Sequence, residues 1–318
     1  MEISEKNKFL LNYSNRKTNL GPNSLSIKDY LNKPEIGLPL CIPANLNYFN
    51  YRKSKIFELN RNITAKKIFL TSKLNYTGIK IFFEKGNKFT FDAIPKQKYK
   101  SIVEKINLNN IKVKKSIKFL NRKYNNNVCA FQTRNIPHFG HESIINYLLS
   151  IFNHVVINPI IEPKKKGDIK LKSLKKIYLK LIKNKYKEKV SFLPVYSNMF
   201  YAGPREAIHH AIIRKNLGFK NFVVGRDHAG SDNLYRPDQA INYIKKFSKK
   251  LKINVLTING AYYCPECKKV LIKGSCNHKN LKDISGTSFR KHLRKKILFK
   301  FANKNIQRYI HLNGIETY

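Results

Sequence analysis

From residue 128 onward, short runs of apolar residues alternate with longer segments whose apolar positions recur about every 3.6 residues. The short runs are typical of buried strands, and the longer segments are typical of helices that pack one face on a sheet. This alternation predicts an α/β fold, in which a parallel sheet carries helices on both faces. The predicted strands are 128–131, 155–161, 190–194, 222–224 and 253–258, and the predicted helices are 141–152, 169–182, 203–216 and 237–247.

The first part of the chain has a different pattern. Short apolar runs at 37–42, 68–70 and 78–83 lie between turns rich in Lys and Asn, which predicts a small β-rich domain over residues 1–120. A Lys/Asn-rich connector at 105–123 ends this part, and its spacing predicts an amphipathic helix near 111–120. We expect residues 121–318 to form the larger α/β domain.

Length and composition indicate a globular protein. The chain has 318 residues, of which 42% are hydrophobic, so it can bury a large core. No apolar run approaches the roughly 18–20 residues that a membrane span needs. The segment Met1–Asn7 carries acidic side chains and lacks an apolar core, so we expect no signal peptide. We therefore predict a soluble, cytoplasmic protein.

The net charge of +44 first suggests a nucleic-acid partner, because clustered Lys and Arg release counterions from phosphate backbones. The basic residues, however, are mostly Lys, they spread along the whole chain, and Asn and Ile are abundant beside them. An AT-rich genome enriches these three residue types in any protein. Because net charge governs solubility and non-specific attraction rather than fold, we favour this compositional origin over nucleic-acid binding.

A polar turn follows the predicted strand 128–131. It begins with Gln132–Asn135 and continues to His138 and His141, which flank Gly140. A turn at the carboxyl end of a parallel strand directs backbone N–H groups and the positive end of a helix dipole toward a bound anion. Histidines there can contact phosphate oxygens, and glycine permits close approach. The pattern is typical of a nucleotidyltransferase, although two histidines at this spacing also occur by chance.

Three further motifs lie downstream. Tyr201–Ala207 (Tyr-Ala-Gly-Pro-Arg-Glu-Ala) opens a predicted helix, and Val224–Gly230 (Val-Gly-Arg-Asp-His-Ala-Gly) follows a predicted strand. Ile284–Arg290 (Ile-Ser-Gly-Thr-Ser-Phe-Arg) opens another helix, where Ser285 or Ser288 could act as the cap. A turn with a helix cap explains each motif when it is taken alone. Loops with this composition can also cradle phosphates, with an Arg side chain pairing them.

Taken in order, the Gln-Thr-Arg-Asn, His-x-Gly-His, Tyr-Ala-Gly-Pro-Arg-Glu-Ala, Gly-Arg-Asp-His-Ala-Gly and Ile-Ser-Gly-Thr-x-x-Arg motifs resemble those of ATP sulfurylase (sulfate adenylyltransferase) of the single-subunit, non-GTPase class. The motifs span about residues 128–295. The resemblance implies transfer of AMP from ATP to sulfate with Mg²⁺, which yields adenosine 5′-phosphosulfate and pyrophosphate, or the reverse reaction. It also implies a Rossmann-like catalytic domain behind a PUA-like N-terminal domain, shortened here before about Ser24, and a homodimer.

The resemblance also implies roles for individual residues. Sulfate would be bound by Gln132, Arg134 and the backbone of Ala229. Catalysis would involve Thr133, Arg134, Asn135, His138 and His141. The nucleotide would be held by Gln132, Asn135, His138, His141, Gly225, Arg226, Asp227, His228, Ser285 and Arg290.

The charges of the two substrates agree with these roles. Sulfate is a weakly nucleophilic dianion that must approach an anionic phosphate, so the site has to cancel like-charge repulsion and hold an in-line geometry. Arg134 and Arg226 can cancel that repulsion. His138, His141 and Asn135, together with Mg²⁺, can stabilise charge on the phosphoryl oxygens. No general base is needed, because sulfate carries no proton at neutral pH.

Three of the five cysteines cluster with a histidine, in the order Cys264, Cys267, Cys276 and His278. An odd number of cysteines in a long chain argues against a disulfide framework. Four thiolate and imidazole ligands at this spacing predict a structural, tetrahedral Zn²⁺ site in the loop 264–278, and free buried thiols are the alternative.

Two other functions remain as alternatives. The first is another nucleotidyltransferase with the His-x-Gly-His turn, and the second is a basic nucleic-acid-binding protein with an inactive catalytic fold. The two Arg-bearing turns favour sulfate, because they supply charge for a second anion. The chain contains no Walker-type G-x₄-G-K-[ST] sequence, so we expect no fused adenylylsulfate kinase.

Overall fold

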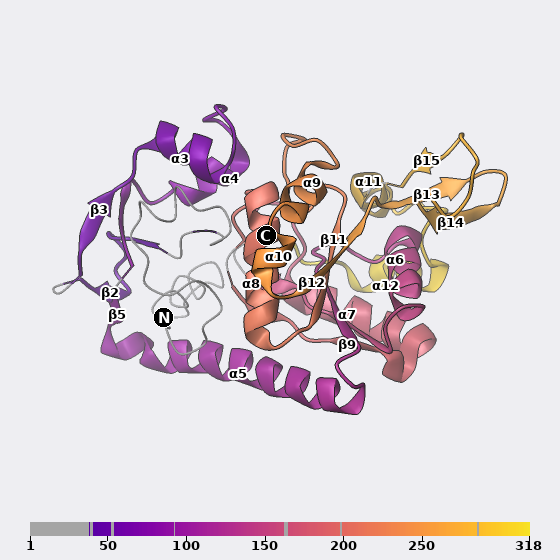
Figure 1. The fold of residues 1–318 in the computed structure, drawn as a ribbon, viewed down its shortest axis with the longest axis horizontal. Coiled ribbons are helices and arrows are strands. Elements are labelled where there is room, and N and C mark those ends of the chain that lie inside the picture. The colour runs from indigo at the N-terminus through magenta and orange to yellow at the C-terminus, as the bar shows by residue number, and fades with distance from the viewer. Residues whose placement is uncertain are drawn as a thin grey trace.

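The computed structural model describes residues 38, 41–51, 54–91, 93–161, 165–197, 199–284 and 286–318. Its centre is a five-stranded parallel sheet with the strand order β12–β11–β6–β7–β9 (Figure 1). The α/β fold class predicted from the pattern is thereby confirmed. The strands are β6 (Val128–Phe131), β7 (His154–Ile157), β9 (Val190–Phe192), β11 (Asn221–Gly225) and β12 (Asn254–Ile258).

Hydrophobic side chains cover both faces of this sheet. Along β6, Cys129 and Phe131 belong to one buried cluster, whereas Val128 and Ala130 belong to the other. Alternate residues of a strand point to opposite faces, so a strand buried on both sides is apolar throughout. One face packs against α6 (Phe139–Leu149), α7 (Leu171–Leu181), α11 (Gly286–Arg294) and α12 (Lys304–Asn313), and the other against α5 (Lys100–Lys123), α8 (Pro204–Leu217), α9 (Gln239–Lys245) and α10 (Ser248–Leu251).

The order of the strands creates a crevice beside β6. From β6 the chain moves outward to β7 and then β9, and it then returns through α8 to β11 on the other side of β6. The strand order therefore reverses between β6 and β11. In open α/β sheets, ligands bind at the carboxyl ends of the strands at such a reversal.

The predicted helices and strands of this part form close to their expected bounds, with one exception. The single strand expected at 155–161 is two strands, β7 and β8 (Ile160–Ile161), and β8 pairs with β10 (Val195–Tyr196) in a separate parallel ladder. Pro159 lies between β7 and β8 and has no N–H to donate to a neighbouring strand, which explains the interruption.

The N-terminal part contains small antiparallel sheets. One has the order β1–β4–β3, and the other pairs β2 with β5. The strands are β1 (Ile42–Pro43), β2 (Phe49–Asn50), β3 (Ile56–Glu58), β4 (Lys88–Thr90) and β5 (Ile94–Pro95), and a 3₁₀ turn (Gln97–Tyr99) leads into α5. Of the run expected to be a strand at 37–42, residues 37, 39 and 40 lie outside the described residues, and β1 begins at its last residue.

The strands expected at 68–70 and 78–83 are wrong. The first run is the last residue of a helix followed by a bend, and the second is helical up to residue 82. The first lies at the end of α3 (Arg61–Ile68), and the second is α4 (Thr77–Phe82). In α4 the buried residues Gly78, Ile79 and Phe82 have helical spacing, and the same spacing recurs in α3. Apolar runs this short do not distinguish a strand from a buried helical turn.

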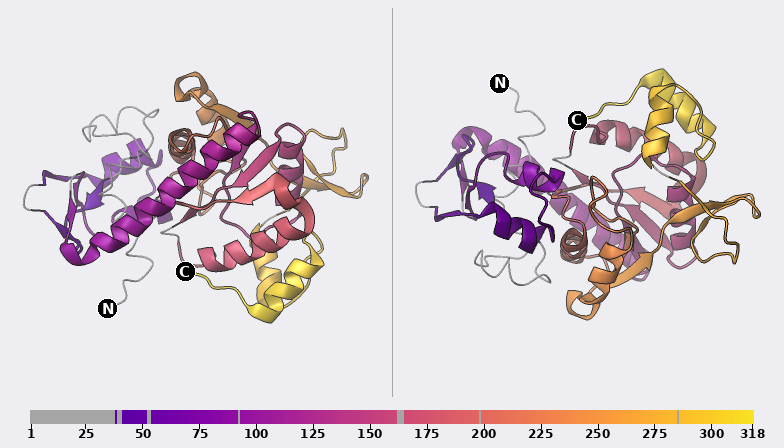
Figure 2. Two further views of the ribbon diagram at one scale, coloured as in Figure 1. Left: turned by 90° about the horizontal axis from the view of Figure 1, so that it is seen from below. Right: turned by 90° about the horizontal axis from the view of Figure 1, so that it is seen from above.

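Helix α5 runs along both parts of the molecule (Figures 1 and 2). Near its beginning, Val103 and Ile106 pack in a cluster with β1 and β2, and toward its end Ile117 and Leu120 pack beneath the parallel sheet. The helix expected near 111–120 is therefore confirmed and is longer than predicted. The domain boundary expected at 120 falls inside α5 and stays a prediction.

The remaining elements lie mainly at the C-terminal edge of the sheet. A small sheet has the order β14–β13–β15, formed by β13 (Ala261–Cys264), β14 (Lys269–Ile272) and β15 (Lys282–Asp283). A π-helical turn (Ile182–Tyr186) and a 3₁₀ turn (Lys187–Lys189) join α7 to β9. Within the described ranges, no helix is both long and apolar enough to cross a membrane.

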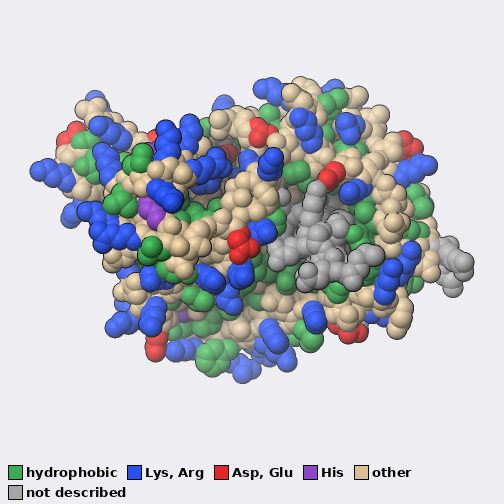
Figure 3. Space-filling view, turned by 180° about the vertical axis from the view of Figure 1, so that it is seen from behind, with side chains coloured by type: hydrophobic (Ala, Val, Ile, Leu, Met, Phe, Trp, Pro, Cys, Tyr) green, Lys and Arg blue, Asp and Glu red, His purple; other side chains and the backbone are tan. Residues whose placement is uncertain are grey.

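Lys and Arg side chains are spread over the face shown in Figure 3, where few acidic side chains accompany them. On this face they do not gather in a single stripe. A dedicated nucleic-acid interface usually concentrates basic side chains on one face or along one helix. The view thus agrees with a compositional origin of the charge, for the face that it shows.

Replacing Gly218 with Ala tests the end of α8. Gly218 ends the helix with φ 101°, and its N–H bonds back to the Arg214 carbonyl. A Cβ there would meet only a methyl group of Ile117 at 3.8 Å, so the cost is almost entirely left-handed backbone strain. We expect Gly218→Ala to lower the free energy of unfolding by about 1 kcal/mol in urea titrations. Lys215→Ala, at an exposed position of the same helix, should change it by less than about 0.5 kcal/mol.

Candidate active site

A cavity of about 730 Å³ opens at the carboxyl ends of β6 and β11. This volume lies in the range of small-ligand sites. The turns after both strands line it, together with the first residues of α6 and α11. It brings together the described residues that were predicted for catalysis, sulfate binding and nucleotide binding: Gln132, Thr133, Arg134, Asn135, His138, His141, Gly225, Arg226, Asp227, His228, Ala229 and Arg290. Ser285 lies outside the described residues.

The two histidines form a cap at the start of α6. The Nδ1 atom of His138 accepts the Gly140 N–H at 3.1 Å, and the Nδ1 atom of His141 accepts the His138 N–H at 3.4 Å. The rings lie close, with centroids 4.1 Å apart. A Cβ on residue 140 would lie 2.8 Å from the His138 ring, so a side chain at this position would displace that ring. The spacing of the motif is therefore set by packing.

Both histidines are held neutral. Burial lowers the pKa of His141 to about 4, and burial lowers the pKa of His138 well below its usual range, with the charges of His141 and Arg290 adding to the effect. Since each Nδ1 accepts a backbone N–H, the single ring proton of each neutral imidazole belongs on Nε2. The pair thus offers two N–H donors near the start of a helix, which suits phosphate oxygens.

Arg134 is fixed by several groups and keeps one donor free. Its Nη2 donates to the Gly230 carbonyl at 2.9 Å, its Nε lies 3.8 Å from a carboxylate oxygen of Asp168, and its guanidinium lies over the Tyr201 ring. Burial acts to lower the pKa of Arg134, but Asp168 and other acidic neighbours raise it overall. The buried Nη1 has no hydrogen-bond partner among the described residues. A charged, oriented donor is therefore available to an anion.

Gln132 is oriented from behind by a residue of α8. Its Oε1 accepts a hydrogen bond from Nη2 of Arg214. Because a guanidinium only donates, this contact fixes the oxygen of the Gln132 amide toward Arg214. The amide NH₂ then remains for the cavity, where it can donate to an anion. Sequence analysis did not identify Arg214, which lies 82 residues from Gln132.

The turn after β11 has a strained backbone. Asp227 and Ala229 both have left-handed conformations, with φ of 51° and 57°. Residues other than glycine adopt this region rarely, and such strain is concentrated at functional sites. A Cβ on residue 230 would lie 2.2 Å from a side-chain oxygen of Asp227, so a larger residue there would displace the Asp227 carboxylate. The Gly230 carbonyl, in turn, holds Arg134.

Arg226 connects this turn to the small β13–β14–β15 sheet. Its Nη1 donates to the Tyr262 hydroxyl at 2.8 Å and to the Asp283 carboxylate at 2.9 Å. Burial acts to lower the pKa of Arg226, but the hydrogen bond to Asp283 and the neighbouring Tyr262 raise it overall. In this arrangement Arg226 braces the turn.

His228 belongs to a buried chain of titratable side chains. Its Nε2 lies 2.9 Å from Nδ1 of His210, whose Nε2 lies 3.3 Å from a carboxylate oxygen of Glu206 without forming a hydrogen bond. Glu206 accepts the N–H groups of Phe200 and Ala202 at the start of α8. Burial raises the pKa of Glu206 to about 7, against the effect of those bonds. The Tyr201–Ala207 motif thus supports the β11 turn from inside the protein.

Thr133, Asn135 and Arg290 brace the remaining wall. The Asn135 N–H donates to the Thr133 hydroxyl at 3.2 Å, which closes the turn after β6. Nη1 of Arg290 donates to the Asn135 side-chain oxygen at 2.9 Å, and Nη2 donates to Thr287. The Arg290 contact links the start of α11 to the first motif, so the two motifs, 155 residues apart, form one wall.

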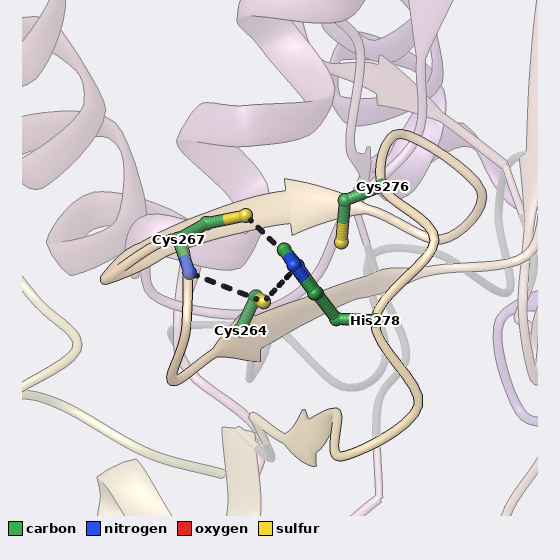
Figure 4. Close-up of side chains that lie close together, drawn as sticks. All are labelled: Cys264, Cys267, Cys276 and His278. Atoms are coloured by element: carbon green, nitrogen blue, oxygen red, sulfur yellow. Dashed lines mark hydrogen bonds between the residues drawn. The ribbon is translucent and has the colours of Figure 1, made fainter.

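The predicted metal ligands meet at the end of the β13–β14 hairpin (Figure 4). The ligand atoms of Cys264, Cys267, Cys276 and His278 all lie within 4.8 Å of one another. Nδ1 of His278 is 3.3 Å from the sulfur of Cys264 and 3.3 Å from that of Cys267. This Cys₃His group could hold a metal ion, because four thiol and imidazole ligand atoms lie close together.

Comparison with protein families assigns the chain. Residues 109–301 match the model of the ATP-sulfurylase family. This chain belongs to the ATP-sulfurylase family. The matched range contains both strands and all the turns that line the cavity. The resemblance seen in the ordered motifs is thus confirmed.

Two relatives show the extent of the match. A sulfate adenylyltransferase of Ignicoccus hospitalis is 36% identical over 240 residues, which is 74% of this chain and 62% of that protein. One of Carboxydothermus hydrogenoformans is 34% identical over 245 residues, which is 76% of this chain and 64% of that protein. The chain therefore spans less than two thirds of the length of these ATP-sulfurylase relatives.

A solved structure shares the fold. The hexameric APS kinase from Thiobacillus denitrificans superposes with a TM-score of 0.50 at 12% identity, over 72% of this chain and 43% of that chain. At this identity the likeness concerns the fold alone. It agrees with the central parallel sheet and the small antiparallel sheets before it, as in ATP sulfurylase.

The buried histidines give the folded protein a defined pH dependence. As the pH falls through about 6.5, an unfolded chain binds protons at these residues, whereas the folded chain does not, so the free energy of unfolding falls. Glu206 acts oppositely, since its raised pKa contributes stability that is present at low pH and lost as the pH rises through about 7. The histidines with lowered pKa near the cavity are His138, His141, His209, His210 and His228.

With five such histidines against one glutamate, we expect the free energy of unfolding to be at least about 2 kcal/mol lower at pH 5.5 than at pH 7.5. Urea titrations at the two pH values measure this difference. His141→Asn should reduce the difference, because it removes one of the groups. Equal or greater stability at pH 5.5 would show that these imidazoles are not buried as neutral groups.

Proposed function

We propose that this protein is a sulfate adenylyltransferase, which transfers the adenylyl group of ATP to sulfate. The observation that carries the proposal is the convergence of two sets of anion-binding groups in one cavity. The Gln132 amide and the free Nη1 of Arg134 form one set, and the two neutral histidines form the other. The relatives from Ignicoccus hospitalis and Carboxydothermus hydrogenoformans are named sulfate adenylyltransferases, which agrees with two anionic substrates.

In this proposal, Arg134 and Gln132 hold the sulfate dianion, with the backbone of Ala229 completing its site. Arg134 cancels part of the repulsion between sulfate and the phosphates, and its fixed guanidinium orients the attacking oxygen. Two further cations strengthen the field, since Lys165 lies near the same Tyr201 ring and Arg290 lines the cavity. The sulfate oxygen needs no base, because it carries no proton near pH 7.

The α-phosphate of ATP would bind at the start of α6. A sulfate oxygen attacks the α-phosphorus in line, and the bond from that phosphorus to the oxygen bridging the β-phosphate breaks, releasing pyrophosphate. His138 and His141 donate to the phosphate oxygens as charge develops there. The turn Gly225–His228 holds the nucleotide. Because both histidines are already neutral near pH 7, their protonation state, and with it their ability to donate, does not change with pH in this range.

Mg²⁺ fits this site as a companion of ATP. Magnesium keeps several water ligands and binds largely through substrate phosphates, with one or two protein carboxylates nearby. Asp227 lines the cavity and supplies such a carboxylate, whereas Asp283 is paired with Arg226. Mg²⁺ would neutralise charge on the phosphate oxygens when it is bound.

We also propose that the Cys₃His group holds a structural Zn²⁺. A tetrahedral site with Zn–S near 2.3 Å and Zn–N near 2.0 Å places neighbouring ligand atoms about 3.5 Å apart. The separations of 3.3 Å from His278 to two sulfurs agree with that geometry. All four positions are protein ligands, so the metal would hold the hairpin and take no part in the chemistry.

Two further properties are proposed on general grounds. We place the protein in the cytoplasm, where ATP is available and thiols such as the Cys₃His group stay reduced. A homodimer and the physiological direction of the reaction stay predictions. The equilibrium can serve sulfate assimilation, or it can make ATP from adenosine 5′-phosphosulfate and pyrophosphate.

Removing the Arg134 side chain should strongly slow the sulfate-dependent reaction. With ATP, Mg²⁺ and pyrophosphatase to draw the equilibrium, the wild-type protein should release pyrophosphate only when sulfate is present. Arg134→Ala should lower kcat/KM for sulfate by about 100- to 1000-fold, as expected for a buried charge contact in the transition state. Arg122→Ala, at an exposed position of α5, removes the same charge and should leave the rate within about twofold. Pyrophosphate release that does not require sulfate would favour another nucleotidyltransferase.

Metal analysis tests the Cys₃His proposal. The purified protein should hold one Zn²⁺ per chain, and Cys276→Ser should lose most of it and melt at a lower temperature, since structural zinc contributes folding free energy. Cys41→Ala, outside the cluster, should keep the metal. A metal-free wild-type protein with an unchanged melting temperature after chelation would instead mean that these thiols are free.

A further inference from the structure

Arg214 lies behind the cavity and is completely buried. It is among the largest fully buried side chains of the protein, and it comes from the last turn of α8. Within the described ranges, it forms no ion pair with a carboxylate, and its Nε has no hydrogen-bond partner. Burying a cation without an ion-pair partner costs several kcal/mol, so its presence calls for a specific cause.

The contacts of Arg214 point toward the first motif. Its Nη2 donates to Oε1 of Gln132 and to the Asn158 carbonyl at 2.6 Å, and its guanidinium lies over the Phe222 ring at 5.3 Å. Burial lowers the pKa of Arg214 to about 9, against the charge of Glu206, so the side chain is still a cation near pH 7. Its Nη1 also donates to the His210 carbonyl at 3.5 Å. Neutral donors could satisfy these three oxygens without this cost. The charge therefore has a use beyond hydrogen bonding.

The Gln132 side chain lies between Arg214 and the cavity, and Arg214 determines which end of its amide faces the cavity. The two ends of an amide side chain have almost the same shape, and only their hydrogen-bond partners decide which end faces a given group. Because Arg214 cannot accept a hydrogen bond, it holds the amide oxygen and turns the NH₂ group to the cavity. A dianion bound to this NH₂ group would lie close to the Arg214 cation, with only Gln132 between them.

We propose that Arg214 is a positioning residue for the sulfate site. It fixes the Gln132 amide as a donor to the bound anion, and it supplies a buried positive charge that the dianion compensates on binding. This inference rests on the proposed function, because sulfate is the anion concerned. Arg214 touches neither substrate. It acts chiefly by orienting Gln132, and its charge adds a smaller attraction across the same side chain.

Steady-state kinetics of Arg214→Met test the proposal. Without Arg214 the Gln132 amide can rotate, and the anion loses an oriented donor and a nearby charge, so the KM for sulfate should rise about 10- to 100-fold. The KM for ATP should stay within about threefold, because the histidine pair is not contacted by Arg214. The matched control is Arg122→Met, which removes the same charge from the surface of α5 and should leave both KM values as in the wild type.

A double-mutant cycle separates positioning from a general effect on the fold. If Arg214 acts through Gln132, then adding Arg214→Met to Gln132→Ala should raise the KM for sulfate by less than about threefold beyond the Gln132→Ala value. Two independent effects would multiply instead. Full multiplication of the two single effects, or a sulfate KM that Arg214→Met leaves unchanged, would overturn the proposal.

Arg214→Lys covers the case in which Arg214→Met fails to fold. Lysine keeps the charge but cannot reproduce the planar fork that reaches the three oxygens, so the KM for sulfate should rise about three- to tenfold in a protein with a wild-type melting profile. A folded Arg214→Lys with unchanged sulfate KM would overturn the inference. The wild type separates failure of the proposed function from failure of this inference. If the wild type shows no sulfate-dependent pyrophosphate release, then the proposed function fails. If the wild type is active and the Arg214 variants keep its KM for sulfate, then this inference alone fails.

Discussion

The parallel pairing of β6 with β11 is the contact on which the site depends. Cys129, Ala130 and Phe131 lie in register with Asn221, Phe222 and Val223, so the turns after the two strands emerge side by side. The first turn carries Arg134 and the two histidines, and the second carries the strained segment that ends at Gly230. Arg134 then bonds to the Gly230 carbonyl, which ties the two turns directly. A shift in this register would separate the groups that we propose to hold the two anions.

The site has charged donors at one place and neutral donors at another. Where the second anion is expected, Arg134 is charged and Arg214 stands behind Gln132 as a buried cation. Where the phosphate is expected, burial has removed the charge from His138 and His141 and left them as neutral donors. Fixed donors of this kind stabilise developing charge without having to reorganise during the reaction. Helix α8 contributes to this arrangement from inside the protein, because His210 contacts His228 and Arg214 holds Gln132.

Sequence reasoning predicted the parts of the site that follow strands. Each motif came directly after an apolar run or opened a helix, so the meeting of the motifs at one sheet edge could be inferred, and the fold class with it. The supporting residues could not be found in this way. Arg214 and Asp168 lie far along the chain from Gln132 and Arg134 and belong to none of the motifs. Tyr201 opens a motif, but nothing in that motif indicates its contact with Arg134. The only signal in the sequence was a helix, Pro204–Leu217, with charged residues among apolar ones on every side.

The errors in the N-terminal part have a related cause. The runs at 68–70 and 78–83 are too short to show a period, and their burial against Phe200 and Tyr201 is a tertiary contact that no local pattern reveals.

The proposed site is tested most directly by a crystal structure with adenosine 5′-phosphosulfate. We expect the sulfate group to lie against the Gln132 amide and Arg134, with the phosphate within hydrogen-bond distance of His138 and His141. A ligand bound elsewhere, or one bound with the two ends exchanged, would contradict it.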